Sequence, residues 1–211
     1  MSNPEPTTHV VVFDVNVYLG IARLLGEPFA MEDFNDRVIS VGKKLEHELT
    51  KDEWCLLAVA VTSSGFLAGT SPLQVWSSDH IDGLVEYKAG QEENKLKKPE
   101  DAGLGWSKDN AQSLRCDLVD WVVRESSGSS INIVIPKSTP PLSHEDGLVY
   151  ATGRDCADAD TLCERYVVTF DSDFMSDESL SYPRVLSPDQ FVRLVRTARR
   201  NLAIQGMTRK P

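Results

Sequence analysis

The residues Val10-Val11-Val12-Phe13-Asp14-Val15-Asn16 place a short apolar run directly before an acid. The run is β-branched and aromatic and is too short for a helix, which is typical of a buried strand in a parallel sheet. Asp14 then falls at the carboxyl end of that strand. Because ligands of open α/β sheets bind at this edge, Asp14 is a candidate site residue.

A second expected strand ends in the same way, far along the chain. Residues 166–170 are mostly apolar, and Asp171 and Asp173 follow them closely. If the two strands are neighbours in one sheet, Asp14 and Asp171 lie near each other and raise each other's pKa. A divalent cation with oxygen ligands relieves such repulsion. The sequence therefore predicts a site for a hard metal ion.

The remaining pattern alternates between strands and helices, which predicts an α/β fold with a central parallel sheet. Caps are indicated at Ser78 or Asp79, at Ser107, at Ser143, and at Ser187 with Pro188 in the first helical position. We expect helices over 17–25, 31–49 and 106–124 and at the start of 54–66, further helices after Ser78, Ser143 and Ser187, and strands over 73–76, 131–135 and 184–186.

Composition sets limits on the class of protein. The 211 residues are 41% apolar, enough for a core, and we expect one domain over 1–211 with a flexible N-terminus at 1–8, a loop insertion at 91–105 and a flexible tail at 203–211. No stretch approaches the ~20 apolar residues of a membrane span, and no export signal is present, so we expect a cytoplasmic protein. The four cysteines lack the spacing of a zinc site.

Basic residues gather near the C-terminus, although the formal net charge is −10. Arg193, Arg196, Arg199 and Arg200 recur at spacings that place them along one flank of the last helix. Two interpretations stay open: a solvated helix face whose cations suit the C-terminal dipole, or a surface that contacts nucleic-acid phosphates.

Four short motifs, in this order along the chain, resemble a PIN domain, the family that includes the VapC-type toxins of bacterial toxin–antitoxin pairs. They are Val-Phe-Asp-Val-Asn at 12–16, Glu-Asp at 145–146, Val-Thr-Phe-Asp-Ser-Asp-Phe at 168–174 and Val-Leu-Ser-Pro-Asp-Gln-Phe at 185–191. The resemblance implies a three-layer α/β/α fold in which acids at the carboxyl edge of a parallel sheet hold Mg²⁺ or Mn²⁺ and hydrolyse RNA. An antitoxin partner and a homodimer are further expectations from the family.

The resemblance also assigns roles to individual residues. Asp14, Asp146 and Asp171 match the family's acids, with Asp173 as an accessory metal ligand, and Asn16, Thr169 and Glu145 are supporting residues. The family's second acid belongs on the helix after the second strand, where Asp79, Asp82 and Glu86 are the choices. Asp82, one turn into that helix, is the residue we expect to complete the catalytic set of Asp14, Asp82, Asp146 and Asp171.

Simpler interpretations remain for the same residues. Asp14 could only cap the next helix, and Glu145 and Asp146 could only be first-turn acids that favour the helix dipole. Asn16 argues against a phosphatase of the haloacid-dehalogenase type, which carries a second acid at that spacing. The main alternative is a PIN-like module that binds a partner or acts as a scaffold without catalysis, because the match at the second acid is imperfect.

Overall fold

The computed structural model describes residues 7–93, 102–133, 142–156, 163–176 and 182–208. Its sheet has the order β2-β3-β1-β5-β6, with β4 paired to the end of β3. The strands are β1 (Thr8–Phe13), β2 (Phe66–Ala68), β3 (Ser71–Ser78), β4 (Ser130–Ile131), β5 (Cys163–Val168) and β6 (Arg184–Leu186). All neighbouring strands are parallel except β2 and β3. The sheet is therefore mixed and mostly parallel, whereas the sequence predicted a parallel one.

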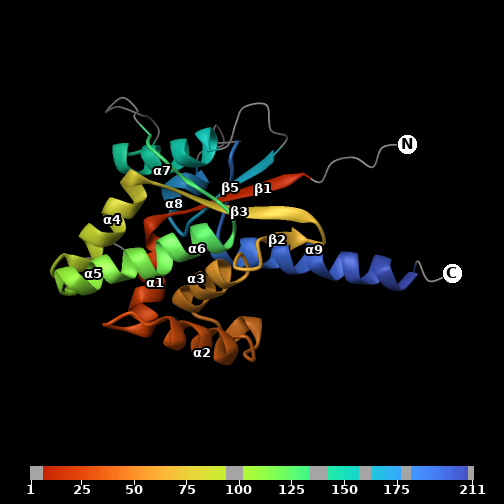
Figure 1. Cartoon of the computed structure of the whole chain (residues 1–211), viewed down its shortest axis with the longest axis horizontal. Coiled ribbons are helices and arrows are strands. Elements are labelled where there is room, and N and C mark those ends of the chain that lie inside the picture. Colours follow the sequence, from red (N-terminus) through yellow and green to blue (C-terminus); the bar gives the residue numbers. More distant parts are fainter. Residues whose placement is uncertain (1–6, 94–101, 134–141, 157–162, 177–181, 209–211) are drawn as a thin grey trace.

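Helices lie on both sides of this sheet (Figure 1). They are α1 (Val15–Leu25), α2 (Met31–Val41), α3 (Lys51–Ala60), α4 (Asp79–Gly90), α5 (Lys108–Leu114), α6 (Asp120–Glu125), α7 (His144–Asp155), α8 (Ser172–Ser176) and α9 (Pro188–Thr208). A 3₁₀ turn spans Glu46–Glu48, and a π-helical segment, Arg115–Val119, joins α5 to α6. The α/β class with helices flanking the sheet is thus confirmed.

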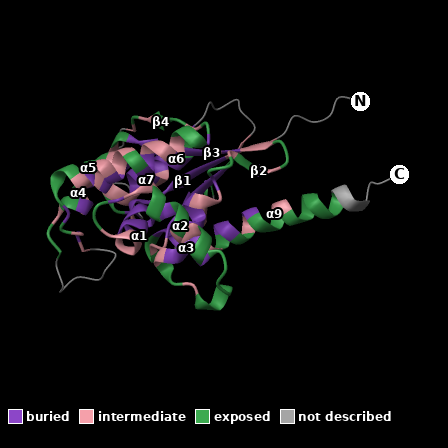
Figure 2. Ribbon diagram, turned by 60° about the horizontal axis from the view of Figure 1, so that its bottom comes forward, coloured by how far each residue is buried: buried purple, intermediate pink, exposed green. Residues whose placement is uncertain are grey.

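The two faces of the sheet are covered by different helices because side chains alternate along each strand. On one face, Gly153 of α7 lies so close to β5 that an added Cβ would stand 2.7 Å from Cγ2 of Val167. On the other face, Phe191 of α9 makes an edge contact with Phe13, at 5.9 Å between ring centroids, and also packs on Tyr166. Figure 2 shows the buried residues gathered around the strands, while α9 extends away from the body with mostly exposed residues.

Several expected boundaries moved once packing was in place. The helix expected over 31–49 ends at Val41, and Leu45, which continues its apolar spacing, is 61% exposed. A new helix, α3, then begins after Thr50, whose hydroxyl accepts a hydrogen bond from the backbone N–H of Glu53. The strand expected over 131–135 is observed only as Ser130–Ile131, and residues 134 and 135 lie outside the described part.

The expected flexible regions lie partly outside the described residues. Only Thr7 and Thr8 of the N-terminal stretch 1–8 are described, and β1 begins at Thr8. Within the insertion 91–105, residues 94–101 are not described, and the two ends are joined by the N–H of Gly105, which donates to the carbonyl oxygen of Gln91 at 2.8 Å. Helix α9 continues to Thr208, so it includes residues 203–208 of the expected tail.

Candidate metal centre

Asp14 follows β1 directly and is the N-cap residue of α1, yet its side chain makes no capping hydrogen bond. Its carboxylate instead accepts a hydrogen bond from the hydroxyl of Thr169 at 2.7 Å and a longer one from the side-chain amide of Asn16 at 3.2 Å. The residue is only 4% exposed. The buried Asp14 carboxylate does not cap α1 but is held by Thr169 and Asn16, the two residues that the resemblance assigned a supporting role.

The environment of Asp14 disfavours its negative charge. Burial, the largest effect, raises its pKa from 3.8 to about 6, although the hydrogen bond from Thr169 lowers it. Asp146 and Asp171 raise that pKa further through their negative charges, while the ammonium group of Lys88 lowers it. Since charge interactions of this kind act over short distances, the fold has brought three acids from separate parts of the sequence into one neighbourhood. We call Asp14, Asp146 and Asp171 the acidic cluster.

Asp146 is positioned by the start of α7. Ser143 caps this helix, because its hydroxyl oxygen accepts the backbone N–H of Asp146 at 3.1 Å, and the same hydroxyl donates to the Asp146 carboxylate at 2.7 Å. Partial burial raises the pKa of Asp146, and the neighbouring charges of Asp171 and Glu145 raise it further. Asp146 is therefore bonded to the N-cap residue of α7 and is also a member of the acidic cluster.

Asp171 lies three residues beyond β5, next to the start of α8. Its backbone N–H donates to the hydroxyl oxygen of Thr169 at 2.9 Å, and its carboxylate accepts the N–H of Asp173 at 2.8 Å. Thr169 therefore connects Asp14 with the backbone of Asp171 through one hydroxyl group. Asp173 is exposed in the first turn of α8.

The donor atoms of the acidic cluster suit a hard divalent cation, since they are carboxylate oxygens. Within the part of the chain that the structure describes, no cationic side chain bonds directly to Asp14, and a bound ion would relieve that lack of positive charge. Nevertheless, within the described ranges no three His, Cys, Asp or Glu side chains stand close enough to share one ion. Asp146 is turned to Ser143 and Asp171 to the N–H of Asp173, so both carboxylates must reorient before they can meet an ion held by Asp14.

Asp82, the expected second acid, does not join the acidic cluster. Its carboxylate accepts a hydrogen bond from the hydroxyl of Ser77 at 2.5 Å. Burial raises the pKa of Asp82, the hydrogen bond from Ser77 lowers it, and the charges that act on it belong to Asp120, Arg115 and Asp79. Asp82 and Glu86 are four residues apart and so share one flank of α4. Glu86 accordingly pairs with Arg115 at 3.7 Å, so this flank faces the α5–α6 helix rather than α7.

Asp79, the other choice for the second acid, is exposed at the first position of α4. The flank of α4 that faces α7 carries His80 and Lys88. Lys88 forms an ion pair with Glu145, and burial together with the charge of Lys88 lowers the pKa of His80, whereas Glu145 raises it. Glu145, which the sequence assigned a supporting role, thus contacts a lysine that the sequence analysis overlooked. His80 and Lys88 are eight residues apart, about two helical turns, and this spacing could have indicated that both lie on the same side of α4.

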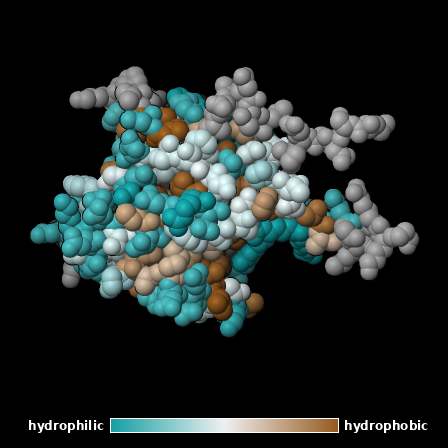
Figure 3. Space-filling model, viewed as in Figure 1, coloured by the Kyte–Doolittle hydropathy of each residue, from teal (hydrophilic) through white to brown (hydrophobic). Residues whose placement is uncertain are grey.

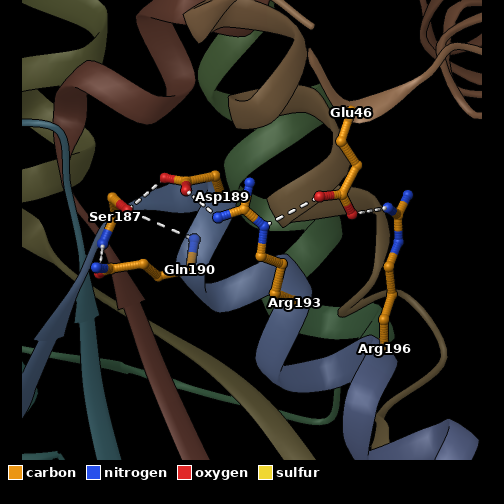
Figure 4. Close-up of polar contacts among 6 residues, drawn as sticks. All are labelled: Glu46, Ser187, Asp189, Gln190, Arg193 and Arg196. Atoms are coloured by element: carbon orange, nitrogen blue, oxygen red, sulfur yellow. Dashed lines mark hydrogen bonds and ion pairs between the residues drawn. The ribbon is translucent and has the colours of Figure 1, made fainter.

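The arginines of α9 are largely occupied by intramolecular contacts (Figure 4). Arg193 pairs with Glu46 and Asp189, both at 3.1 Å, and Arg196 pairs with the same Glu46 at 3.3 Å. The guanidinium group of Arg199 donates to the backbone carbonyl oxygens of Val61, Phe66 and Leu67 and to the hydroxyl of Ser64.

Arg200 is exposed and, within the described part of the chain, forms no ion pair. The visible flank of α9 next to the body is hydrophilic, with apolar residues toward its far end (Figure 3), where Leu202 and Ile204 are exposed. Three of the four arginines therefore bind other groups of the same chain, and the interpretation as a solvated helix face is the better supported one.

Comparisons of the chain with protein-family models, with curated proteins and with solved structures find no match. Among the helices of the described residues, none combines the length and the apolar content that crossing a membrane requires. The geometry and chemistry of the acidic cluster therefore carry the functional argument.

Proposed function

We propose that this protein is a PIN-like, metal-dependent endoribonuclease that hydrolyses phosphodiester bonds at the acidic cluster. The observation that carries the proposal is Asp14: a buried carboxylate at the carboxyl end of the central strand that caps nothing and whose pKa is raised to about 6. Such strained ionisable groups gather at functional sites. Asp146 and Asp171 reach the same place from elements far away in the sequence.

Each side chain has a role in this proposal. Asp14, Asp146 and Asp171 would hold Mg²⁺ or Mn²⁺, and Asp173 stands near enough in sequence to assist. When bound, such an ion lowers the pKa of water and neutralises charge on the phosphoryl group. Thr169 and Asn16 keep the Asp14 carboxylate oriented, and Glu145 holds Lys88 beside the cluster. A catalytic role for Asp82 is not retained, because this residue faces the α5–α6 helix.

The biological role follows from the resemblance to VapC-type toxins, so we propose a toxin whose partner is an antitoxin. A basic segment of that antitoxin would suit a chain with a formal net charge of −10. Homodimer formation and a cytoplasmic location belong to the same proposal. Because these roles are argued from the resemblance of four short motifs, their test follows the demonstration of nuclease activity.

One observation favours a second candidate function, a PIN-like binding or scaffold module without catalysis. Among the described residues no acid of α4 joins the cluster, and the residue of α4 whose charge acts on Asp14 is a lysine, Lys88, on the flank that faces α7. With fewer carboxylates and an added positive charge, the site attracts a divalent ion less strongly. The protein would then use the same surface only to bind RNA or a protein partner.

Cleavage assays separate the two functions. Wild type, Asp14→Asn and Asp146→Asn are incubated with a panel of single-stranded and structured RNAs in Mn²⁺, Mg²⁺ or EDTA. We expect metal-dependent cleavage by wild type and a loss of at least about 100-fold in both variants, because each removes a charged ligand of the ion. Asp36→Asn, an exposed acid on α2 with the same charge change, is the control and should cleave normally.

Circular dichroism of every variant verifies that the fold is intact. Undiminished cleavage by both site variants would show that the activity lies elsewhere. If wild type cleaves no RNA with any of these ions but still binds RNA, the module without catalysis is the correct assignment.

A further inference from the structure

A groove of about 840 Å³ runs along α9, next to the face of the sheet that this helix covers. One wall is a flank of α9 between Gln190 and Asn201, and the other consists of β6 with Tyr166 of β5. Leu67 of β2 also lines the groove. The α9 residues that line it recur every three or four positions, so a single flank of the helix faces the groove over about 17 Å.

Both walls of the groove are held firmly by the rest of the protein. On another flank of α9, Arg199 donates hydrogen bonds to the carbonyl oxygens of Val61 and Leu67, at 2.7 and 3.1 Å. Strand β6 is paired with β5, where Val185 lies opposite Val167. A ligand therefore meets a surface that is already formed, and little free energy is lost in ordering that surface when it binds.

The lining of the groove combines apolar and basic side chains. Leu194 and Ala198 of α9 and Val185 of β6 are only half-buried, so they leave apolar surface that a ligand can cover. Among the described residues that line the groove, two are arginines and none is acidic, although the chain has a formal net charge of −10. This lining complements a ligand that is acidic and partly apolar.

Arg184 supplies the positive charge that is available to such a ligand. It is exposed, its Cζ lies 5.9 Å from the centroid of the Tyr166 ring, and within the described part of the chain it pairs with no acid. Arg193, in contrast, is already shared between Glu46 and Asp189 (Figure 4). Because a planar guanidinium group binds a carboxylate through two parallel hydrogen bonds, Arg184 can accept an acidic side chain while it stays on the tyrosine ring.

We propose that this groove is the docking site for an acidic amphipathic helix of a partner protein. The apolar face of that helix covers Leu194, Ala198 and Val185, and a carboxylate at its edge pairs with Arg184. Ile204 follows Asn201 by three residues and is 49% exposed, so the same flank of α9 offers apolar surface beyond the groove. A partner helix of about three turns matches the roughly 17 Å of the lining, and a straight helical wall suits helix-to-helix packing.

A synthetic peptide tests the docking site, because the chemistry of the partner is stated although its identity is not. The probe is a fluorescent peptide of about 16 residues with leucine and glutamate at helical spacing. Its affinity for full-length wild type, Arg184→Gln and Thr197→Glu is measured by fluorescence anisotropy. We expect binding to wild type, a loss of about fivefold in Arg184→Gln because a charge-assisted pair is removed, and a loss of at least about tenfold in Thr197→Glu.

The two variants act in different ways, which keeps the test independent of folding. Thr197 lines the groove and is exposed, so Thr197→Glu places a repelling acid there without disturbing the core, and circular dichroism verifies the fold. Arg124→Gln on α6 and Asn35→Glu on α2 make the same changes in net charge at exposed positions outside the groove and should bind the peptide as wild type does. A peptide of the same composition in scrambled order has no apolar face and should bind at least about tenfold more weakly.

Four results would overturn the proposal. They are no binding of the acidic peptide, equal binding of the scrambled peptide, unchanged affinity in both groove variants, and equal losses in the control variants. Displacement of the peptide by a single-stranded RNA would assign the groove to nucleic acid instead. A wild-type dimer in sedimentation that Thr197→Glu dissociates would show that the groove joins two copies of this chain, which also contradicts the proposed partner.

Discussion

Asp14→Asn should make the metal-free protein more stable at neutral pH, although it changes a residue of the proposed active site. The substitution keeps the size of the side chain and a carbonyl oxygen that can still accept the Thr169 hydroxyl. Because the pKa of Asp14 rises from 3.8 to about 6 in the folded protein, mainly through burial, ionising it costs the folded state about 3 kcal/mol relative to the unfolded state. Asparagine avoids that cost.

The sign of this effect depends on pH in a defined way. Above about pH 6 the Asp14 carboxyl is ionised in both states, and the folded state bears the full cost. Between pH 6 and 3.8 the folded state holds a proton that the unfolded state releases, so the cost shrinks as the pH falls. Below pH 3.8 both states are protonated and the cost is absent. The stabilisation in Asp14→Asn should therefore be largest above pH 6.5 and disappear near pH 4.

Urea unfolding followed by circular dichroism, in EDTA at a series of pH values from 4 to 8, measures this difference. Asp36→Asn makes the same change in net charge on an exposed helix and should shift the free energy of unfolding little at any pH. If Asp14→Asn is equally stable or less stable than wild type at pH 8, or if its gain does not decline toward pH 4, Asp14 is not the strained carboxylate that we infer.

Two further predictions concern packing and the arginines of α9. Gly153→Ala should lower the free energy of unfolding by about 1–2 kcal/mol in urea titrations, because the new methyl group meets Val167 at 2.7 Å. Gly83→Ala, in an exposed helical position with no atom within 4 Å, should raise the free energy of unfolding by about 0.5–1 kcal/mol. A gain in both variants would contradict the close contact of α7 with the sheet. Arg199→Gln should lower the free energy of unfolding by about 1–3 kcal/mol, since the hydrogen bonds of Arg199 to backbone oxygens such as that of Val61 are lost. The same variant should leave RNA affinity in filter binding unchanged. Weaker RNA binding at full stability would favour the phosphate-contact interpretation instead.

Local sequence signals predicted the parts of the site that depend on neighbours in the chain. The end of an apolar run placed Asp14 at a strand end, and the N-caps at Ser78 and Ser143 fixed the starts of α4 and α7. These features arise from side-chain hydrogen bonds and strand length within a few residues, so they can be identified from the sequence alone. The antiparallel strand β2 was not expected, because a strand of three residues is too short to show an alternating pattern of apolar and polar residues.

The position of the expected second acid depends on contacts that the sequence does not show. Asp82 and Lys88 lie on the same helix, and the sequence shows their spacing but not how α4 is rotated about its axis. Packing against α1, α5 and α7 fixes that rotation, and it turns Lys88 toward the acidic cluster and Asp82 toward Arg115. The sequence left two interpretations of the α9 arginines open for the same reason, since the oxygen atoms that bind Arg199 belong to residues more than 130 positions earlier.

The sequence by itself determined the class of fold, the strand ends that carry Asp14 and Asp171, and the helix starts that carry Asp146 and Glu145, because each follows from short-range patterns of apolar, acidic and capping residues. Only the tertiary structure decided that three of these acids share one neighbourhood, that Asp14 is buried without a capping role, and that Lys88 rather than Asp82 stands beside them. Burial and charge interactions depend on atoms that are close in space but distant in sequence, so no local pattern encodes them.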